Sequence, residues 1–252
     1  YFHPPITIIN SKNIIMLICV NLLLLSDISS QKEPKATEVW IPEARVVTPA
    51  KNNTPPSDAI VLFDGKNLEE WSSMGDAKAE WEIADNCMTV LKGKGNIKTK
   101  RDFGDIQLHI EWRSPAIVKE DGQDRGNSGV FFQQRYEVQI LDNYNNKTYS
   151  NGQAGSVYKQ HIPLVNACKK PGEWQTYDII FMAPKFNKDN IKIRSGSLTV
   201  LHNGVLVQNH VEVKGTTENV GQPKNIAHGK APIMLQDHSN PVSYRNIWVR
   251  EL

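Results

Sequence analysis

The sequence lacks the features that mark several large classes of protein. Its 29 basic and 27 acidic residues nearly balance, for a net charge of +2, and it has no stripe of Lys and Arg with interleaved aromatics. This balance argues against nucleic acid as a partner. The GxSxG, P-loop and HExxH motifs are also absent, as is a GxGxxG motif after a strand. Serine-hydrolase, nucleotide-binding and zinc-protease functions therefore have little support.

Cysteine is scarce, and its spacing excludes a common metal site. The chain has three cysteines, Cys19, Cys87 and Cys168, and no CxxC pair, so a zinc knuckle has no support. Cys19 lies in an apolar run near the start. Cys87 and Cys168 are compatible with one disulfide, but their spacing does not decide it, and two small buried thiols are the favoured alternative.

No apolar run reaches the length of a membrane span. A span needs about 20 apolar residues, whereas the run within residues 13–31 has about a dozen and is broken by Asn21. With Lys12 ahead of it, the run resembles a signal peptide, which we place at residues 1–30. We therefore expect a secreted or periplasmic protein without a transmembrane span in the mature chain. Met16 is an alternative start site, and a hydrophobic N-terminal helix is the alternative to a signal peptide.

Proline separates this start from the rest of the chain. Residues 31–58 contain five prolines and no sustained period, which predicts a linker or extended arm. The region from 59 to 252 forms one predicted domain.

That domain has no stretch of twelve or more residues with a convincing helical period, and no internal repeat. Apolar and polar residues alternate strictly over residues 106–113, as in a half-buried strand. Asn203 and Gly204 separate two β-rich runs, a strong signal for a hairpin. We predict an all-β sandwich or jelly roll of two antiparallel sheets, with polar side chains on an outer face.

One polar face of a predicted strand is the strongest candidate site. The stretch GNSGVFFQQRYEVQILDN, residues 126–143, alternates like a strand and puts Glu137 and Gln139 on one face. Asp142 follows at the strand end, and Asn127 precedes it in a Gly-rich turn. A carboxylate and an amide two residues apart together supply donors and acceptors for vicinal sugar hydroxyls.

Further candidates come from three other segments. Glu111 shares a face of its strand with His109. If this strand belongs to the same sheet as the strand of Glu137, the two carboxyl groups lie on one surface. His238 is a candidate proton-transfer group, since its unperturbed pKa lies near neutrality. The remaining candidates for substrate binding are Tyr158, Gln236 and Arg245. For each of these residues, an exposed or core side chain without a function is the competing interpretation.

Six segments in order resemble the 3-keto-disaccharide hydrolase family: LFDGKNLEEW, GNSGVFF, YEVQILDN, GQAGSVY, PGEWQTYDIIF and QDHSNPVSYRNIWVREL. The resemblance runs from about residue 60 to the end of the sequence. It implies a concanavalin A-like jelly roll and secreted or periplasmic bacterial proteins that act on oxidised glycosides.

The chemistry that the resemblance implies has a clear logic. A ketone at C3 acidifies the C2 proton, a base removes it, the C1 substituent leaves, and water adds back. On this sequence Glu137 or His238 is the candidate base, Glu111 the candidate acid, and Arg245 or a bound cation the stabiliser of the enediolate. Carboxylate oxygens with an amide are hard ligands, so a divalent cation is one candidate cofactor. Nothing indicates an oligomeric state.

Two alternatives stay open. An oxocarbenium mechanism with two carboxyl groups is the competing enzymatic route. A non-catalytic carbohydrate-binding module of the same fold is the competing function, because a fold does not determine a function. The aligned acids, amides and histidine favour the enzyme, since binding modules usually use exposed aromatics.

Overall fold

The computed structural model describes residues 33–51 and 54–252. The predicted signal peptide and Cys19 lie outside these residues. The chain divides after Val46 into two units. In the first unit, Pro34–Thr37 forms one short 3-10 turn, η1, and its other described residues have no regular structure. The second unit, Val47–Leu252, holds every strand of the described chain, so residues 47–58 belong to the unit that carries the sheets. No helix among the described residues is long and apolar enough to cross a membrane.

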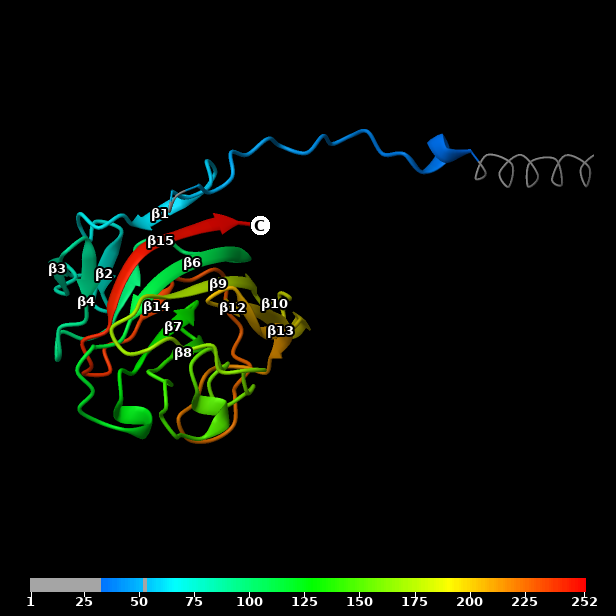
Figure 1. Ribbon diagram of the computed structural model, residues 1–252. Coiled ribbons are helices and arrows are strands. Elements are labelled where there is room, and N and C mark those ends of the chain that lie inside the picture. Colours follow the sequence, from blue (N-terminus) through cyan, green and yellow to red (C-terminus); the bar gives the residue numbers. More distant parts are fainter. Residues whose placement is uncertain (1–32, 52–53) are drawn as a thin grey trace, which may run out of the picture. The chain divides into compact units, whose positions relative to one another are not determined.

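An eight-stranded antiparallel sheet forms one layer of this unit. Its strands follow the order β13-β12-β9-β6-β15-β4-β3, and β1 pairs with β15 off this path. Figure 1 shows β15, β6, β9 and β12 arching beside β7 and β8 of the other layer. The bounds are β13 Val205–Val213, β12 Gly196–His202, β9 Gln175–Met182, β6 Ile106–Arg113, β15 Ser243–Glu251, β4 Cys87–Thr89, β3 Glu82–Ala84 and β1 Ile60–Phe63.

A five-stranded antiparallel sheet forms the second layer, in the order β2-β5-β14-β7-β8. A two-stranded ribbon, β10-β11, and two 3-10 turns complete the second unit. The prediction of an all-β sandwich is confirmed. The bounds are β2 Trp71–Ser73, β5 Ile97–Thr99, β14 Met234–Leu235, β7 Ser128–Phe132, β8 Tyr136–Ile140, β10 Lys185–Phe186, β11 Lys192–Arg194, η2 Gly122–Asp124 and η3 Ser150–Gly152.

The core lies between the two sheets and follows the alternation of the strands. Ile110 and Trp112 of β6 are buried, and so are Val138 and Ile140 of β8. All four belong to one apolar cluster that joins the two layers. The side chains between them in sequence therefore point outward from their own sheet.

The hairpin predicted at Asn203 and Gly204 is confirmed between β12 and β13. Both residues have positive φ, 53° and 79°, as a two-residue turn of type I′ requires.

The stretch that we predicted as one strand, residues 126–143, is instead a hairpin of β7 and β8. Its turn residues Gln133 and Gln134 have φ of 52° and 59°. The buried Gln133 side chain donates a hydrogen bond to the Phe103 carbonyl at 2.9 Å. This contact helps to hold a backbone conformation that β-turns usually assign to Gly or Asn.

Candidate active site

The polar faces of β6 and β8 point to opposite sides of the sandwich. Trp112 of β6 faces the core, so the adjacent Glu111 points away from it on the outer face of the eight-stranded sheet. Val138 of β8 faces the same core from the other layer, so Glu137 points outward from the five-stranded sheet. The expectation that Glu111 joins Glu137 in one cleft is therefore wrong. Alternation gives the face of a strand but not the sheet to which the strand belongs.

Glu111 is instead part of an ion-pair network on the outer face of the eight-stranded sheet. Arg245 Nε donates to Glu111 Oε2 at 2.6 Å, and Asn246 Nδ2 donates to Oε1 at 2.9 Å. Burial alone would raise the pKa of Glu111, but hydrogen bonds from His109, Asn246 and Arg245 lower it to about 2. A carboxyl group held ionised in this way is a poor proton donor, so the role of acid expected for Glu111 is not supported.

Arg245 is committed to the same face. Its guanidinium carbon lies 4.2 Å from the ring centroid of Trp174, and that of Arg113 lies 4.6 Å from the same ring. Because Arg245 pairs with Glu111, the prediction that it stabilises an enediolate beside Glu137 is wrong.

Glu137 lies on the outer face of the five-stranded sheet, and only 4% of the residue is exposed. Its carboxyl group lies over Gly129 of β7, where an added Cβ would come within 2.5 Å of Glu137 Oε1. Among the described residues its carboxyl oxygens have no hydrogen-bond partner. Burial raises the pKa of Glu137 to about 8, because a desolvated carboxylate loses the stabilisation that water gives its charge.

Two glutamines flank Gly129, over which this carboxyl group lies. Gln139 is the cross-strand partner of Gly129, and its Nε2 donates to Asn127 Oδ1 at 3.3 Å. Gln236 lies on the other side of Gly129, since its backbone N donates to the Gly129 carbonyl at 3.1 Å. Gln139 Oε1 and Gln236 Oε1 are buried and unpaired. Buried polar atoms are normally satisfied, so this group of Glu137, Gln139, Gln236 and Asn127 is built to receive a polar ligand.

Gln123, which the sequence analysis missed, encloses this group. Its Nε2 donates to Thr148 Oγ1 at 2.8 Å and to the Gly152 carbonyl at 3.0 Å. Its Oε1 accepts from Gln139 Nε2 at 3.3 Å. Gln123 thereby links η2 and η3 next to Gln139. It lies in a loop between two recognisable strands, where no period marks a side chain as inward.

Tyr158 lies next to Glu137 on the side of β8 that does not pair with β7. The segment before it pairs with β8 through an antiparallel bridge between Val157 and Val138, and Tyr158 N donates to the Glu137 carbonyl at 3.2 Å. The sequence placed Tyr158 in a loop at the site, and the structure puts it beside Glu137.

His238 lies apart from Glu137. It is exposed and lies in the segment after β14. Within that sheet, Met234 of β14 pairs with Phe131 of β7, and Phe131 pairs with Glu137 of β8. His238 comes four residues after Met234. No hydrogen bond or ion pair joins His238 to Glu137 among the described residues, and His238 lines a different cavity. The expected convergence of Glu137 and His238 is therefore not observed.

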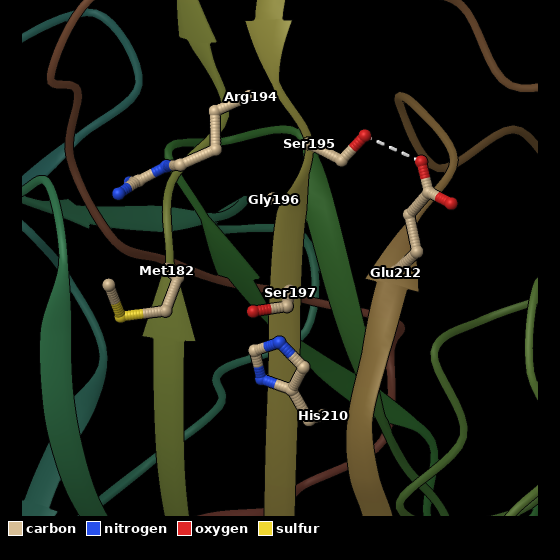
Figure 2. A pocket seen from close by; sticks show the side chains of 7 residues that line it. All are labelled: Met182, Arg194, Ser195, Gly196, Ser197, His210 and Glu212. Carbon is tan, nitrogen blue, oxygen red and sulfur yellow. Dashed lines mark hydrogen bonds between the residues drawn. The ribbon is translucent and has the colours of Figure 1, made fainter.

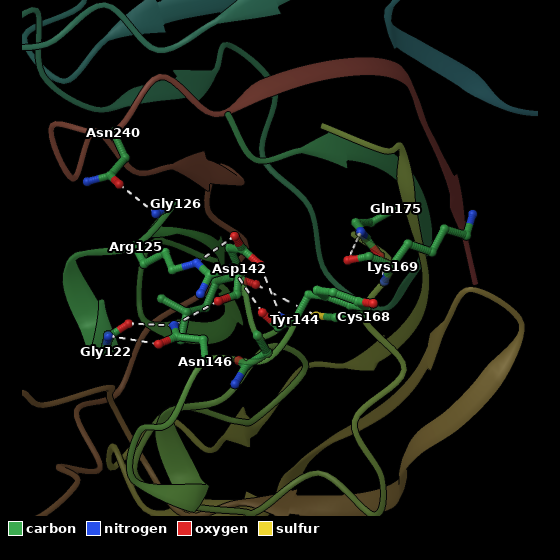
Figure 3. Close-up of polar contacts among 12 residues, drawn as sticks. Gly122, Arg125, Gly126, Asp142, Tyr144, Asn146, Cys168, Lys169, Gln175 and Asn240 are labelled. Carbon is green, nitrogen blue, oxygen red and sulfur yellow. Dashed lines mark hydrogen bonds and ion pairs between the residues drawn. The ribbon is translucent and has the colours of Figure 1, made fainter. Parts of the chain in front are cut away.

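Asp142 and His238 instead line a neighbouring cavity of about 980 Å³, together with Arg125. Arg125 Nε donates to Asp142 Oδ2 at 2.8 Å, and its Nη2 donates to the Tyr144 carbonyl at 2.9 Å (Figure 3). The cavity adjoins the site, because it is lined by Gly126, the residue before Asn127. Its volume lies within the range of small-molecule sites.

A second hollow, of about 380 Å³, lies over β12 and β13 (Figure 2). Ser195 Oγ donates to Glu212 Oε1 at 2.6 Å, and Arg194 Nη2 pairs with Asp105 at 2.8 Å, so that only Arg194 Nε is buried without a partner among the residues that line this hollow. This hollow therefore has fewer buried polar atoms without a partner than the group around Glu137.

The described residues contain neither a cluster of metal ligands nor a disulfide bond. No group of three His, Cys, Asp or Glu side chains there is placed to hold a metal ion. Cys87 and Cys168 are both free, and Cys87 is buried.

Comparison with known proteins identifies the family. The profile of the 3-keto-alpha-glucoside-1,2-lyase-like domain matches residues 58–250. The chain belongs to this family. The family is named for the cleavage of a carbohydrate, and the predicted resemblance to 3-keto-disaccharide hydrolases is confirmed.

Two solved structures resemble this 3-keto-alpha-glucoside-1,2-lyase-like chain to different degrees. A candidate glycosyl hydrolase from Parabacteroides distasonis ATCC 8503 is 51% identical, with a TM-score of 0.85, over 87% of this chain and 97% of its own. A second candidate glycosyl hydrolase from the same organism is 16% identical, with a TM-score of 0.56, over 77% of this chain and 94% of its own; it shows the fold alone. No curated protein matches.

Proposed function

We propose that the chain is a glycoside-cleaving enzyme that acts on 3-keto-disaccharides or related glycosides. The observation that carries this proposal is the unpaired, buried carboxyl group of Glu137 over Gly129, whose two strand neighbours, Gln139 and Gln236, each have an unpaired amide oxygen. The family and the 51% identical candidate glycosyl hydrolase support the same substrate class.

Glu137 is the base in this proposal. A ketone at sugar C3 makes the C2 proton acidic enough for a carboxylate, and a base works best when its pKa lies near the working pH. The burial that raises the pKa of Glu137 to about 8 provides that match. The electron pair of the C2–H bond then forms the C1=C2 bond as the C1 substituent leaves. Water adds back across that bond, so the net reaction is hydrolysis.

The amides around Glu137 replace Arg245 as the groups that hold the substrate oxygens. The unpaired Oε1 atoms of Gln139 and Gln236 are acceptors, so they suit the hydroxyl groups of the sugar. The Gln139 Nε2 group already donates to Asn127 and Gln123.

The cavity of about 980 Å³ offers room for the rest of the substrate. Only 4% of Glu137 is exposed, so in this proposal the turns linked by Gln123 separate to admit the sugar. Closure of such turns over a bound sugar would exclude water from the enediolate.

The arrangement of carboxyl groups supports elimination over the oxocarbenium route. That route needs two carboxyl groups on either side of the scissile bond. Glu111 lies on the opposite face, and Asp142 is paired with Arg125.

We also propose that the protein is secreted or periplasmic, because of the apolar run within residues 13–31. Fractionation of expressing cells tests this, and retention of the full-length chain in the cytoplasm contradicts it.

Incubation with paired 3-keto and unmodified disaccharides in deuterated water tests the reaction. We expect product from the 3-keto substrate alone, with deuterium at C2 of the released keto sugar. Product without label contradicts the elimination but leaves a glycosidase. Binding of both sugars without any product indicates a carbohydrate-binding module instead.

A further inference from the structure

Tyr158 and Glu137 are direct neighbours across two paired strands. Val157 and Val138 face each other in an antiparallel bridge and are both fully buried. Tyr158 lies in the turn that follows this bridge, and its backbone N donates to the Glu137 carbonyl at 3.2 Å. Burial and a hydrogen bond to Tyr149 raise the pKa of Tyr158, and the charge of Glu137 adds to this. The Tyr158 hydroxyl therefore stays protonated beside the proposed base.

Tyr149 connects Tyr158 to solvent. The two hydroxyl oxygens lie 2.6 Å apart, and the rings meet edge to face at 6.3 Å. Tyr149 is 41% exposed, while Tyr158 is half-buried. The two hydroxyl groups thus form a short path for protons from the surface to the side of Glu137.

Lys159 and Asn219 hold this pair of hydroxyl groups in place. Lys159 Nζ lies 5.4 Å from the ring centroid of Tyr158 and 5.7 Å from that of Tyr149. It also donates to Asn219 Oδ1 at 2.9 Å, and Tyr158 donates to the same oxygen at 3.4 Å. The backbone of Lys159 has φ of +57°, a conformation uncommon for residues other than Gly, and its N donates to the Asn151 carbonyl at 2.8 Å. Strained backbone of this kind is concentrated at functional sites.

Gly152 makes room for the Tyr149 ring. A Cβ at this position would lie 2.0 Å from Tyr149 Cε2, so the ring rests directly on the glycine. The glycine carbonyl also accepts the hydrogen bond from Gln123 that links the two turns. The Tyr149 ring and the enclosure of the site therefore depend on the same residue.

We infer that Tyr158 is the acid that protonates the leaving-group oxygen, that Tyr149 resupplies its proton from solvent, and that Lys159 positions both. This inference rests on the proposed function. As Glu137 takes the C2 proton, the C1–O bond breaks and its electron pair goes to the leaving oxygen, which takes the Tyr158 proton. Water returns a proton to Tyr158 through Tyr149, and the resulting hydroxide adds to C1 while Glu137, whose proton has exchanged with solvent, protonates C2. Lys159 places a positive charge beside the transient phenolate.

The dependence of the rate on the leaving group tests the assignment of Tyr158. General acid catalysis contributes about 10²–10⁴-fold when the leaving group is a poor one. We expect Tyr158→Phe to lose about that factor in kcat/KM on a 3-keto glucoside with an alkyl or sugar leaving group. With a 4-nitrophenyl leaving group, which needs no proton, the loss should stay below about threefold. An equal loss on both substrates, or no loss on either, overturns the inference.

Two further variants separate a chemical role from a structural one. Tyr136→Phe removes a hydroxyl group from the core side of β8, where it bonds His228 at 2.6 Å. This control should leave kcat/KM unchanged on both substrates. Tyr149→Phe keeps the Tyr158 hydroxyl and should slow the alkyl substrate about tenfold while sparing the nitrophenyl one; this variant carries the test if Tyr158→Phe does not fold. An inactive wild-type protein overturns the proposed function and this inference together. An active one with uniformly slowed tyrosine variants overturns only the inference.

Discussion

Two ionisable residues on the outer faces of the sheets have raised pKa values for opposite reasons. Glu137 has no partner for its carboxyl group and a pKa raised to about 8 by burial. His109 lies in a charged pair: its Nδ1 is 2.7 Å from Asp178 Oδ1, and its ring stacks on Trp248 at 5.0 Å. Burial alone would lower the pKa of His109, but hydrogen bonds to Asp178 and Glu111 raise it to about 9.

Glu137 should make the rate depend on pH in a direction opposite to that of an acid catalyst. Since the base is active when ionised, kcat/KM should rise about tenfold per pH unit below pH 8 and level off above it. In a pH–rate profile from pH 5 to 9, a rate that falls as pH rises towards 8 would contradict the assignment of Glu137 as the base.

His109 should stabilise the fold in a defined pH window. Its folded pKa of about 9 lies above the ordinary value of 6.5 for histidine. The stabilisation is therefore complete below pH 6.5 and is lost as the pH rises through 9, by up to about 3 kcal/mol. Urea unfolding of the wild type and of Asp178→Asn across this range measures it. The variant should lose most of the slope, and equal slopes in both proteins would contradict the pairing.

The raised pKa of Glu137 also makes the fold less stable as the pH rises, and this loss begins at a lower pH than that from His109. Its contribution is complete below pH 4.5 and is lost as the pH rises through 8. Glu137→Gln has no charge to desolvate, so it should unfold at higher urea than the wild type at pH 8 and show little difference at pH 4.5. A lower urea midpoint for the variant at pH 8 would contradict the buried, unpaired state of this carboxyl group.

At the scale of the element, β7 provides the surface on which the Glu137 carboxyl group lies. A Cβ at Gly129 would be 2.5 Å from Glu137 Oε1 and 2.9 Å from Phe131 Cε2. Gly129→Ala should therefore displace the carboxyl group and lower kcat/KM at least tenfold, at a stability cost of about 1–3 kcal/mol. Gly75→Ala is the matched control, because a Cβ there meets no atom within 4 Å. Kinetics with thermal unfolding compare the two variants, and unchanged kinetics in Gly129→Ala would argue against a role for the Glu137 carboxyl group.

The same strands show what could be predicted from the sequence and what could not. Strict alternation was enough to predict β6 and its core side chains, and Asn203 was enough to predict a hairpin, because both depend on local chemistry. The turn at Gln133 was missed, since its positive φ is held by a contact with the distant Phe103 carbonyl. The sheet to which a strand belongs is also a tertiary property. Alternation therefore predicted correctly that Glu111 points outward, but it could not show that Glu111 lies on a different sheet from Glu137.

The residues of the candidate site also differ in how far the sequence predicted them. Glu137, Gln139 and Asn127 are close in sequence and lie on one hairpin, so the local pattern brought them together. Gln236 was also a predicted candidate, but its place beside Gly129 comes from the pairing of β14 with β7, which no spacing indicates. Gln123 was missed, because it joins the group through loop contacts alone.

At the scale of the whole molecule, the two sheets present outer faces with different physical characters. Glu111 on the eight-stranded sheet is ionised, with a pKa of about 2, and bound by Arg245 and Asn246. Glu137 on the five-stranded sheet is unpaired and costs energy to ionise. One face therefore uses its carboxylate for stability, whereas the other retains a carboxyl group that weakens the fold at neutral pH. Retention of such a group is typical of a site under functional constraint.

This division predicts opposite consequences for one chemical change at two positions. Glu111→Gln removes the acceptor of a charge-assisted hydrogen bond, so it should cost about 1–3 kcal/mol of unfolding free energy and leave kcat/KM within about twofold. Glu137→Gln should keep or raise the unfolding free energy at pH 8 while lowering kcat/KM by about 10²–10⁴. Because the two carboxyl groups lie on opposite faces of the core, the double variant should show the sum of the two stability changes. Urea unfolding and kinetics on one set of four proteins measure all of these effects. A loss of turnover in Glu111→Gln as large as that in Glu137→Gln would mean that the chemistry depends on the other face, and would move the active site to the eight-stranded sheet.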